Sequence, residues 1–179
     1  QIVQHADAFR AGMSASGVIS VVKHFPGMGA VTENTDTSSG VTDTTTTADG
    51  AAVGVFRSEI EAGARCVMVS SAIYTNLDPG VPAVFSPVIT GTLLRQTLGF
   101  TGVVMTDDVS AATQVEGWSP ADRAVLAIQA GADIVLDSAD PSLAPEMVQA
   151  VATKAATDPA FAALVDAAAR RVVTMKLTR

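Results

Sequence analysis

Two adjacent carboxylates, Asp107 and Asp108, directly follow a mostly apolar run at residues 102–106. Strands that are buried on both faces read as continuous apolar runs, so this stretch predicts a strand that ends on two acids. In parallel α/β folds, the chemistry gathers at the C-terminal ends of the strands. We therefore expect a carboxylate site at this strand end. For Asp108 a structural role stays open, with its carboxylate held by backbone amides or capping the next helix.

A second polar pair, Lys23 and His24, follows the apolar run at residues 18–22 and precedes the turn Phe25-Pro26-Gly27. Lysine offers three donors, and a neutral histidine offers one donor and one acceptor, which suits a ligand rich in hydroxyl groups. A lone histidine at a strand end is more often structural. The neighbouring lysine and the glycine turn favour the functional interpretation.

The elements that must position these side chains alternate along the chain. Helices are predicted at residues 2–16, 51–64, 87–98, 121–130 and 161–177, with another beginning at Asp140-Pro141, and strands at 18–22, 66–69, 103–106 and 133–136. Ser86-Pro87 and Ser119-Pro120 each place a capping serine before a proline at the first helical position. Such alternation implies parallel strands with right-handed crossovers. Four units form either a small open sheet or half of an eight-stranded barrel, and periodicity does not choose between them.

Two connections stand out between these elements. Residues 28–50 are rich in Thr, Ser, Asp and Gly and lack periodicity, and a loop of this length is usually functional or mobile. A linker is the alternative, but the predicted strands on both sides favour an active-site loop. Residues 74–85 predict an irregular loop with a turn at Asp78-Pro79-Gly80.

Composition narrows the class of protein. The 179 residues are 48% hydrophobic and 16% charged with a net charge of -7, which predicts a globular domain and argues against a nucleic-acid partner. The single cysteine, Cys66, lies in an apolar run and predicts a buried thiol; one cysteine excludes an intrachain disulfide and a cysteine-built zinc site. No metal cluster is evident from the two histidines, and no apolar run is long enough to span a membrane.

Two segments resemble a known family. The segment Lys23-His24-Phe25-Pro26-Gly27-Met28-Gly29 resembles the Lys-His-Phe-Pro-Gly-His-Gly signature of family 3 glycoside hydrolases, most closely the β-N-acetylhexosaminidase branch. The segment Met105-Thr106-Asp107-Asp108-Val109-Ser110 resembles the nucleophile segment of that family. Shorter matches at Leu77-Asp78-Pro79, Ala130-Gly131-Ala132-Asp133 and Arg170-Arg171-Val172 follow in the family's order.

The resemblance implies a fold and an activity. The catalytic domain of the family is a (β/α)₈ TIM-type barrel, and residues 1–179 match about its last four β/α units. A half barrel leaves a sheet edge exposed, so we expect a companion fragment, a partner chain or self-association to close it. The implied activity is retaining hydrolysis of β-linked sugars, N-acetylglucosaminides above all, without a cofactor or metal. A location at the cell envelope or outside the cell is favoured over the cytoplasm.

The resemblance also assigns roles to residues. It makes Asp107 the nucleophile, with Asp108 as the alternative, and it places Lys23, His24, Met105 and Asp108 in sugar binding. The branch uses an Asp-x-His pair on the long loop as its acid/base, and that pair falls on Asn34-Thr35-Asp36 here. Met28 replaces a further histidine of the motif.

The missing histidine leaves the proton donor open. Asp36 or Glu33 could serve as the acid only if burial or a neighbouring carboxylate raised its pKa. The alternative is a catalytically impaired relative that binds carbohydrate or has a structural role. A phosphate- or nucleotide-binding domain is a third interpretation, weakened because Gly27-Met28-Gly29 is only a fragment of a phosphate loop.

Overall fold

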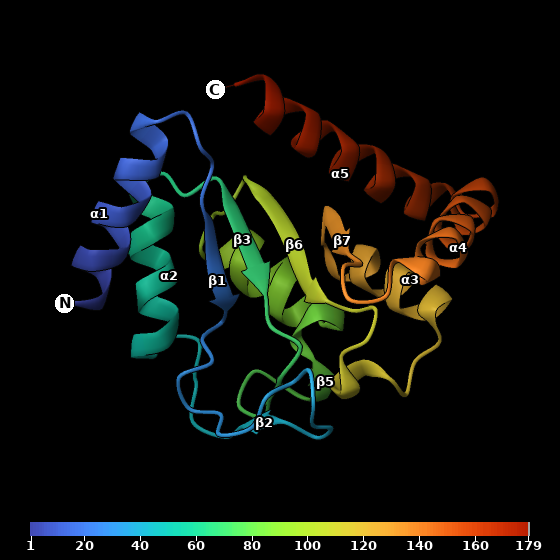
Figure 1. Ribbon diagram of the computed structural model, residues 1–179, viewed down its shortest axis with the longest axis horizontal. Coiled ribbons are helices and arrows are strands. Elements are labelled where there is room, and N and C mark those ends of the chain that lie inside the picture. The colour runs from blue at the N-terminus through green and yellow to red at the C-terminus, as the bar shows by residue number, and fades with distance from the viewer. Residues whose placement is uncertain (179) are drawn as a thin grey trace.

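The computed structural model describes residues 1–178, and its centre is a four-stranded parallel sheet. The strand order is β1-β3-β6-β7, and the strands run in one direction (Figure 1). Their bounds are β1 Val21–Phe25, β3 Cys66–Val69, β6 Val103–Asp108 and β7 Ile134–Leu136. All four residues of β3 are buried, as expected for a strand covered on both faces. The predicted parallel α/β arrangement is confirmed.

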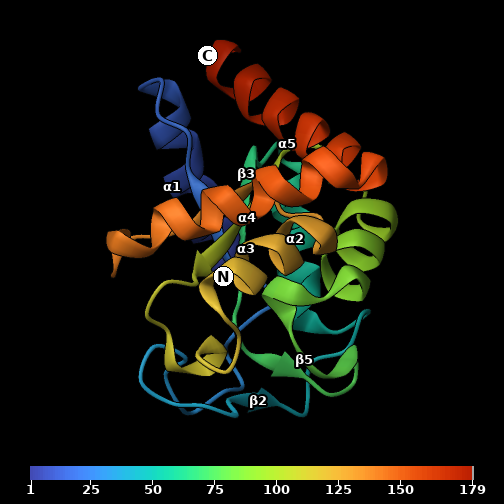
Figure 2. The ribbon, with the colours of Figure 1, turned by 90° about the vertical axis from the view of Figure 1, so that its right-hand side faces the viewer.

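Helices flank and back this sheet. α1 and α2 lie together beside β1, η2 lies behind the sheet, and α3 and α4 lie beside β7 (Figures 1 and 2). α5 lies near the end at which the strands begin (Figure 1). The bounds are α1 Ile2–Ala15, α2 Ala51–Glu61, the π-type helix η2 Val88–Thr97, α3 Pro120–Ala130, α4 Ala144–Thr157 and α5 Pro159–Leu177, with short 3₁₀ turns η1 Ala83–Phe85, η3 Thr113–Val115 and η4 Pro141–Leu143.

The predicted helix caps form. The Ser119 hydroxyl accepts a hydrogen bond from the Asp122 amide, and Pro120 begins α3. The Ser86 hydroxyl likewise accepts from the Ile89 amide at 3.0 Å, at the start of η2. Both hydroxyls satisfy backbone donors that a helix start leaves unpaired.

The first strand begins later than predicted. It spans Val21–Phe25 instead of 18–22, so Lys23 and His24 belong to the strand itself. Pairing starts where Val21 faces Cys66 on β3, whereas Val18 stays 50% exposed. An apolar run marks a strand, but pairing with the neighbouring strand decides where it starts. For the same reason the third strand extends to Asp108 instead of ending at 106.

The two long connections contain regular structure that the sequence did not predict. A small three-stranded sheet, in the order β2-β4-β5, lies beyond the C-terminal ends of the main strands (Figure 1). Its strands are β2 Thr42–Asp43, β4 Ile73–Tyr74 and β5 Asp78–Pro82. Residues 74–85 are therefore not an irregular loop, and residues 28–50 include a strand. β2 pairs with β4, which lies far along the chain, and residue patterns within the loop do not reveal such a pairing. β5 pairs with β4 just before it, as an antiparallel hairpin.

The core fills the space between the main sheet and its helices. Phe25, Val67 and Val104 from the strands and Ile89 and Leu94 from η2 are fully buried there. Cys66 is 3% exposed, and burial raises the pKa of its thiol to about 11, so the predicted buried thiol is confirmed. Within residues 1–178, no helix is long and apolar enough to cross a membrane.

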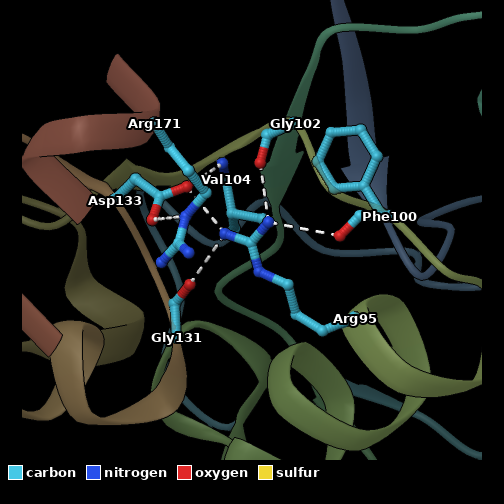
Figure 3. Close-up of polar contacts among 7 residues, drawn as sticks. All are labelled: Arg95, Phe100, Gly102, Val104, Gly131, Asp133 and Arg171. Carbon is cyan, nitrogen blue, oxygen red and sulfur yellow. Dashed lines mark hydrogen bonds and ion pairs between the residues drawn. The ribbon is translucent and has the colours of Figure 1, made fainter. Parts of the chain in front are cut away.

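A buried ion pair network fixes β7 to its neighbours (Figure 3). The Asp133 side chain is fully buried and accepts hydrogen bonds from the Val104 amide at 2.9 Å, Arg95 Nη2 at 2.6 Å and Arg171 Nε at 2.8 Å. Arg95 also donates to the carbonyl of Gly102 at 2.6 Å. This one carboxylate thus links η2, β6 and α5 at the start of β7.

Candidate active site

A cleft of about 470 Å³ opens at the C-terminal ends of the main strands. All four main strands line it, and the first three contribute Lys23 from β1, Met68 from β3 and Asp107 from β6. Asp36 from the loop 28–50 and Leu136 from β7 also line it. The cleft therefore gathers residues that are more than one hundred positions apart in the sequence.

Asp107 presents one carboxylate oxygen to this cleft region without a protein donor. Its Oδ1 accepts a hydrogen bond from the Asp108 amide at 3.0 Å. Its Oδ2 lies 3.6 Å from His24 Nε2, which is beyond ordinary hydrogen-bond distance, and accepts no hydrogen bond within residues 1–178. The Asp107 side chain is 19% exposed, so a ligand in the cleft can reach it.

His24 on β1 lies close to Asp107 on β6, although β3 separates the two strands in the sheet. Burial lowers the pKa of His24 below its ordinary value of 6.5, and the charge of Asp107 acts in the opposite direction. Lys23 also lowers the His24 pKa, and Asp36 raises it. A neutral imidazole at neutral pH can both donate to and accept from a hydroxyl group.

The turn after these two residues needs glycine. Gly27 has a φ of +130°, and a Cβ at this position would lie 2.7 Å from the Cβ of Ala52. The buried Tyr74 donates its hydroxyl to the Gly27 carbonyl at 3.0 Å. The glycine of the motif thus lets the chain turn away from β1 against the first residues of α2.

Asp108 also lines the cleft, but its carboxylate has a different set of hydrogen-bond partners from that of Asp107. Its Oδ1 accepts from the Ser110 amide at 2.7 Å and the Ser110 hydroxyl at 2.5 Å. Its Oδ2 accepts from the amides of Ser138 at 2.9 Å and Ala139 at 2.8 Å, and from the Ser138 hydroxyl. Burial alone would raise the pKa of Asp108, but these donors hold it well below its usual range.

The loop 28–50 is attached to the segment after β6. The Asp36 carbonyl accepts from the Thr113 amide at 3.2 Å. The buried Gln114 side chain makes two hydrogen bonds with the Val41 backbone, at 2.8 and 3.2 Å. Asp36 is exposed and lines the cleft; Glu33 is exposed and does not line it.

Some residues of the cleft were not foreseen from the sequence, and three predicted residues, His24, Glu33 and Met105, do not line it. Ser138 and Ala139 after β7, and Ala111 and Ala112 after β6, line the cleft. Their positions just after apolar strands are the only signal that could have indicated them. Met105 is half-buried within β6, where it faces Met68 and Ile134 on the adjacent strands, and it does not line the cleft.

The fold and the site together define a class of protein: an α/β domain with a parallel sheet and a cleft that holds carboxylates at the C-terminal ends of the strands. Residues 1–175 match the family described as "Glycosyl hydrolase family 3 N terminal domain". The chain therefore belongs to glycosyl hydrolase family 3.

Two relatives agree with this membership. The chain is 40% identical over 134 residues to an uncharacterized secreted glycosyl hydrolase of Arthroderma benhamiae, covering 73% of this chain and 38% of that protein. It is 32% identical over 148 residues to a beta-hexosaminidase of Nitrosomonas eutropha, covering 82% of this chain and 42% of that protein. The chain thus spans less than half the length of these curated relatives.

A solved structure resembles this fold over nearly the whole chain. The beta-N-acetylhexosaminidase of Beutenbergia cavernae superposes with a TM-score of 0.97 at 63% identity, covering 98% of this chain and 52% of that one. A family 3 glycosyl hydrolase of Mycobacterium smegmatis gives a TM-score of 0.85 at 28% identity, covering 97% and 54%. The likeness again extends over about half of each relative.

Proposed function

We propose that this chain carries the nucleophile half of a retaining glycoside hydrolase that acts on β-linked sugars, N-acetylglucosaminides in particular. The observation behind this proposal is the free Asp107 Oδ2 at the cleft, with His24 and Lys23 beside it. The names of the relatives support the substrate class. Lys23 and His24 would hold sugar hydroxyls, so that the anomeric carbon lies in front of Asp107.

The proposed reaction has two steps. Asp107 attacks the anomeric carbon, the glycosidic C–O bond breaks, and an acid gives its proton to the leaving oxygen. Water, deprotonated by the same group, then attacks the anomeric carbon and releases Asp107 and the sugar. Asp36 is the better candidate for this acid/base than Glu33, because only Asp36 lines the cleft.

A second candidate is sugar binding without efficient turnover. It is favoured by the absence of histidine from residues 28–50, where the branch carries its acid/base. The two candidate functions share the proposed sugar-binding residues Lys23 and His24 and differ only in whether an acid donates a proton to the leaving oxygen.

We also propose that residues 1–179 form the C-terminal half of a (β/α)₈ barrel, with residues 28–50 as its active-site loop. β1 and β7 are edge strands here, and the domains of this family are TIM-barrel-like. Four further β/α units would close the sheet, supplied by the same polypeptide or by a partner chain. The coverage of about half of each solved relative supports this arrangement.

Covalent labelling tests the nucleophile in the active assembly. A fluorinated N-acetylglucosaminyl fluoride should leave its sugar on Asp107, identified by peptide mass spectrometry, and Asp107→Asn should abolish both labelling and hydrolysis. Asp166→Asn, an equal change of charge at an exposed position on α5, is the control and should retain both. Unchanged turnover by Asp107→Asn would exclude the assignment.

Activated substrates separate the two candidates. Aryl N-acetylglucosaminides have good leaving groups and need little acid catalysis. Hydrolysis of the aryl glycoside but not of a natural disaccharide would indicate a working nucleophile and a failed acid. Sugar binding with no turnover of either substrate would favour the binding function.

A further inference from the structure

The carboxylate of Asp108 has no accepting capacity left to offer a sugar. Its two oxygens receive five hydrogen bonds, three from backbone amides and two from serine hydroxyls, contributed by Ser110, Ser138 and Ala139. A carboxylate has about four lone-pair sites, so these donors saturate it. Hydrogen bonds to an ionised acceptor are about twice as strong as neutral ones, so a sugar hydroxyl would have to displace strong partners.

These donors come from two different loops. Ser110 belongs to the segment that follows β6, and Ser138 and Ala139 follow β7. Ser110 extends the link, because its hydroxyl also accepts from the Asp140 amide at 3.0 Å. One carboxylate therefore joins the loop at residues 109–112 to the loop at residues 137–140.

Both loops form walls of the cleft around Asp107. Ala111 and Ala112 line it from the first loop, and Ser138 and Ala139 line it from the second. The Asp108 amide also donates to Asp107 Oδ1. Asp108 therefore joins the two walls through its side chain and hydrogen-bonds to the Asp107 carboxylate through its backbone amide.

We propose that Asp108 is a positioning residue, which holds these two loops as walls of the cleft and keeps Asp107 aligned, and that it does not contact the sugar. The expected effect of Asp108 on catalysis rests on the proposed function, whereas the joining of the two loops by Asp108 does not. The proposal replaces the sugar-binding role that the family resemblance implies for Asp108.

Amide hydrogen exchange in this chain tests the joining of the loops. Asparagine has the same shape but offers one accepting oxygen, and its NH₂ group would face N–H and O–H donors. We therefore expect Asp108→Asn to speed amide exchange about tenfold, because a charge-assisted hydrogen bond is lost. The faster exchange should appear at Ser138 and Ala139 or at Ser110, depending on which side the new NH₂ group faces. The amides of β3 should be unchanged. Unchanged exchange at all three residues would overturn the proposal.

Two further variants keep this test decisive. Asp140 lies in the same loop, and among the described residues its carboxylate accepts only from Ser142. Asp140→Asn should therefore leave the exchange of Ser138 and Ala139 unchanged. Should Asp108→Asn fail to fold, Ser138→Ala removes a single donor and should speed exchange in the 137–140 loop by a smaller factor. No effect of Ser138→Ala on that loop would count against the proposal.

The labelling rate of Asp107 tests the catalytic consequence in the active assembly. A misplacement of about 1 Å can cost about 100-fold in rate, so Asp108→Asn should slow labelling at least tenfold while Asp140→Asn does not. Loss of labelling with both loops still protected would assign Asp108 to sugar contact and overturn the proposal. If the unsubstituted protein is not labelled but Asp108→Asn still speeds exchange in the two loops, the proposed function is rejected. The positioning role of Asp108 is then still supported.

Discussion

At the scale of single residues, the site depends on the closeness of His24 to Asp107. The two side chains are 23% and 19% exposed, and 3.6 Å separates His24 Nε2 from Asp107 Oδ2. Burial lowers the His24 pKa more than Asp107 raises it. The imidazole is therefore neutral at neutral pH and can both donate and accept a hydrogen bond, while Asp107 keeps a free oxygen.

Removing the Asp107 charge should lower the His24 pKa further. In Asp107→Asn the effect that raises the pKa is lost, and burial and Lys23 still lower it. Titration of the imidazole carbon-bound protons by NMR measures this, with the exposed His5 as an internal reference. A rise of the His24 pKa in Asp107→Asn would contradict the geometry described here.

The same residue predicts how stability depends on pH. A folded-state pKa below 6.5 means that the unfolded chain binds the His24 proton more readily. The contribution of neutral His24 is complete above pH 6.5 and is lost as the pH falls through that value toward the folded pKa. Urea unfolding of the unsubstituted protein and of His24→Gln at pH 7.5 and 5.5 should show a smaller loss of stability in the variant.

At the scale of elements, Asp133 holds four parts of the fold in register. Its buried carboxylate meets η2 through Arg95, β6 through the Val104 amide and α5 through Arg171, at the residue that precedes β7 (Figure 3). Burial lowers the pKa of Arg95, and the Asp133 charge opposes this. β7 begins beside these contacts, so the cleft wall after β7 depends on them.

Asp133→Asn should destabilise the fold by about 3 kcal/mol, because it leaves two partly buried guanidinium groups without their counter-charge. The free energy of unfolding in urea measures the change. Asp166→Asn is the control, since Asp166 is exposed on α5, and it should change stability by less than about 0.5 kcal/mol. Equal stability of the two variants would refute the role of Asp133.

At the scale of the whole molecule, the main sheet has two free edges in the described chain. β1 and β7 each pair with one neighbour, and Val21 on β1 is 40% exposed. Val18 before β1 is 50% exposed, and Val148 on α4 is 67% exposed. Unpaired edges beside apolar side chains favour association with another strand.

A charge on the β1 edge should weaken that association. We expect the isolated chain to have a solution mass above 18.2 kDa by light scattering, and Val21→Lys to shift it toward that value. Val88→Lys is the control, because Val88 is 43% exposed on η2, behind the sheet. A stable, monodisperse monomer of the unsubstituted chain would contradict the expectation of edge closure by self-association.

The sequence alone predicted the alternation of the four main strands with helices and the family signature, but not strands β2, β4 and β5. The cap at Ser119, the strand at Cys66–Val69 and the acids that end β6 follow from local patterns, because caps and buried runs depend on neighbouring residues. The roles of Asp107, Lys23 and His24 stay predictions that rest on the resemblance and on their meeting at one strand end.

Only the tertiary structure decided where β1 starts, that Asp78–Pro82 within the predicted loop form strand β5, and that Asp36 rather than Glu33 lines the cleft. It also showed that Asp108 is saturated by Ser110, Ser138 and Ala139. Strand pairing and loop contacts join residues that are far apart in the chain, so their register is set by packing and nonlocal hydrogen bonds, which no local pattern of residues encodes.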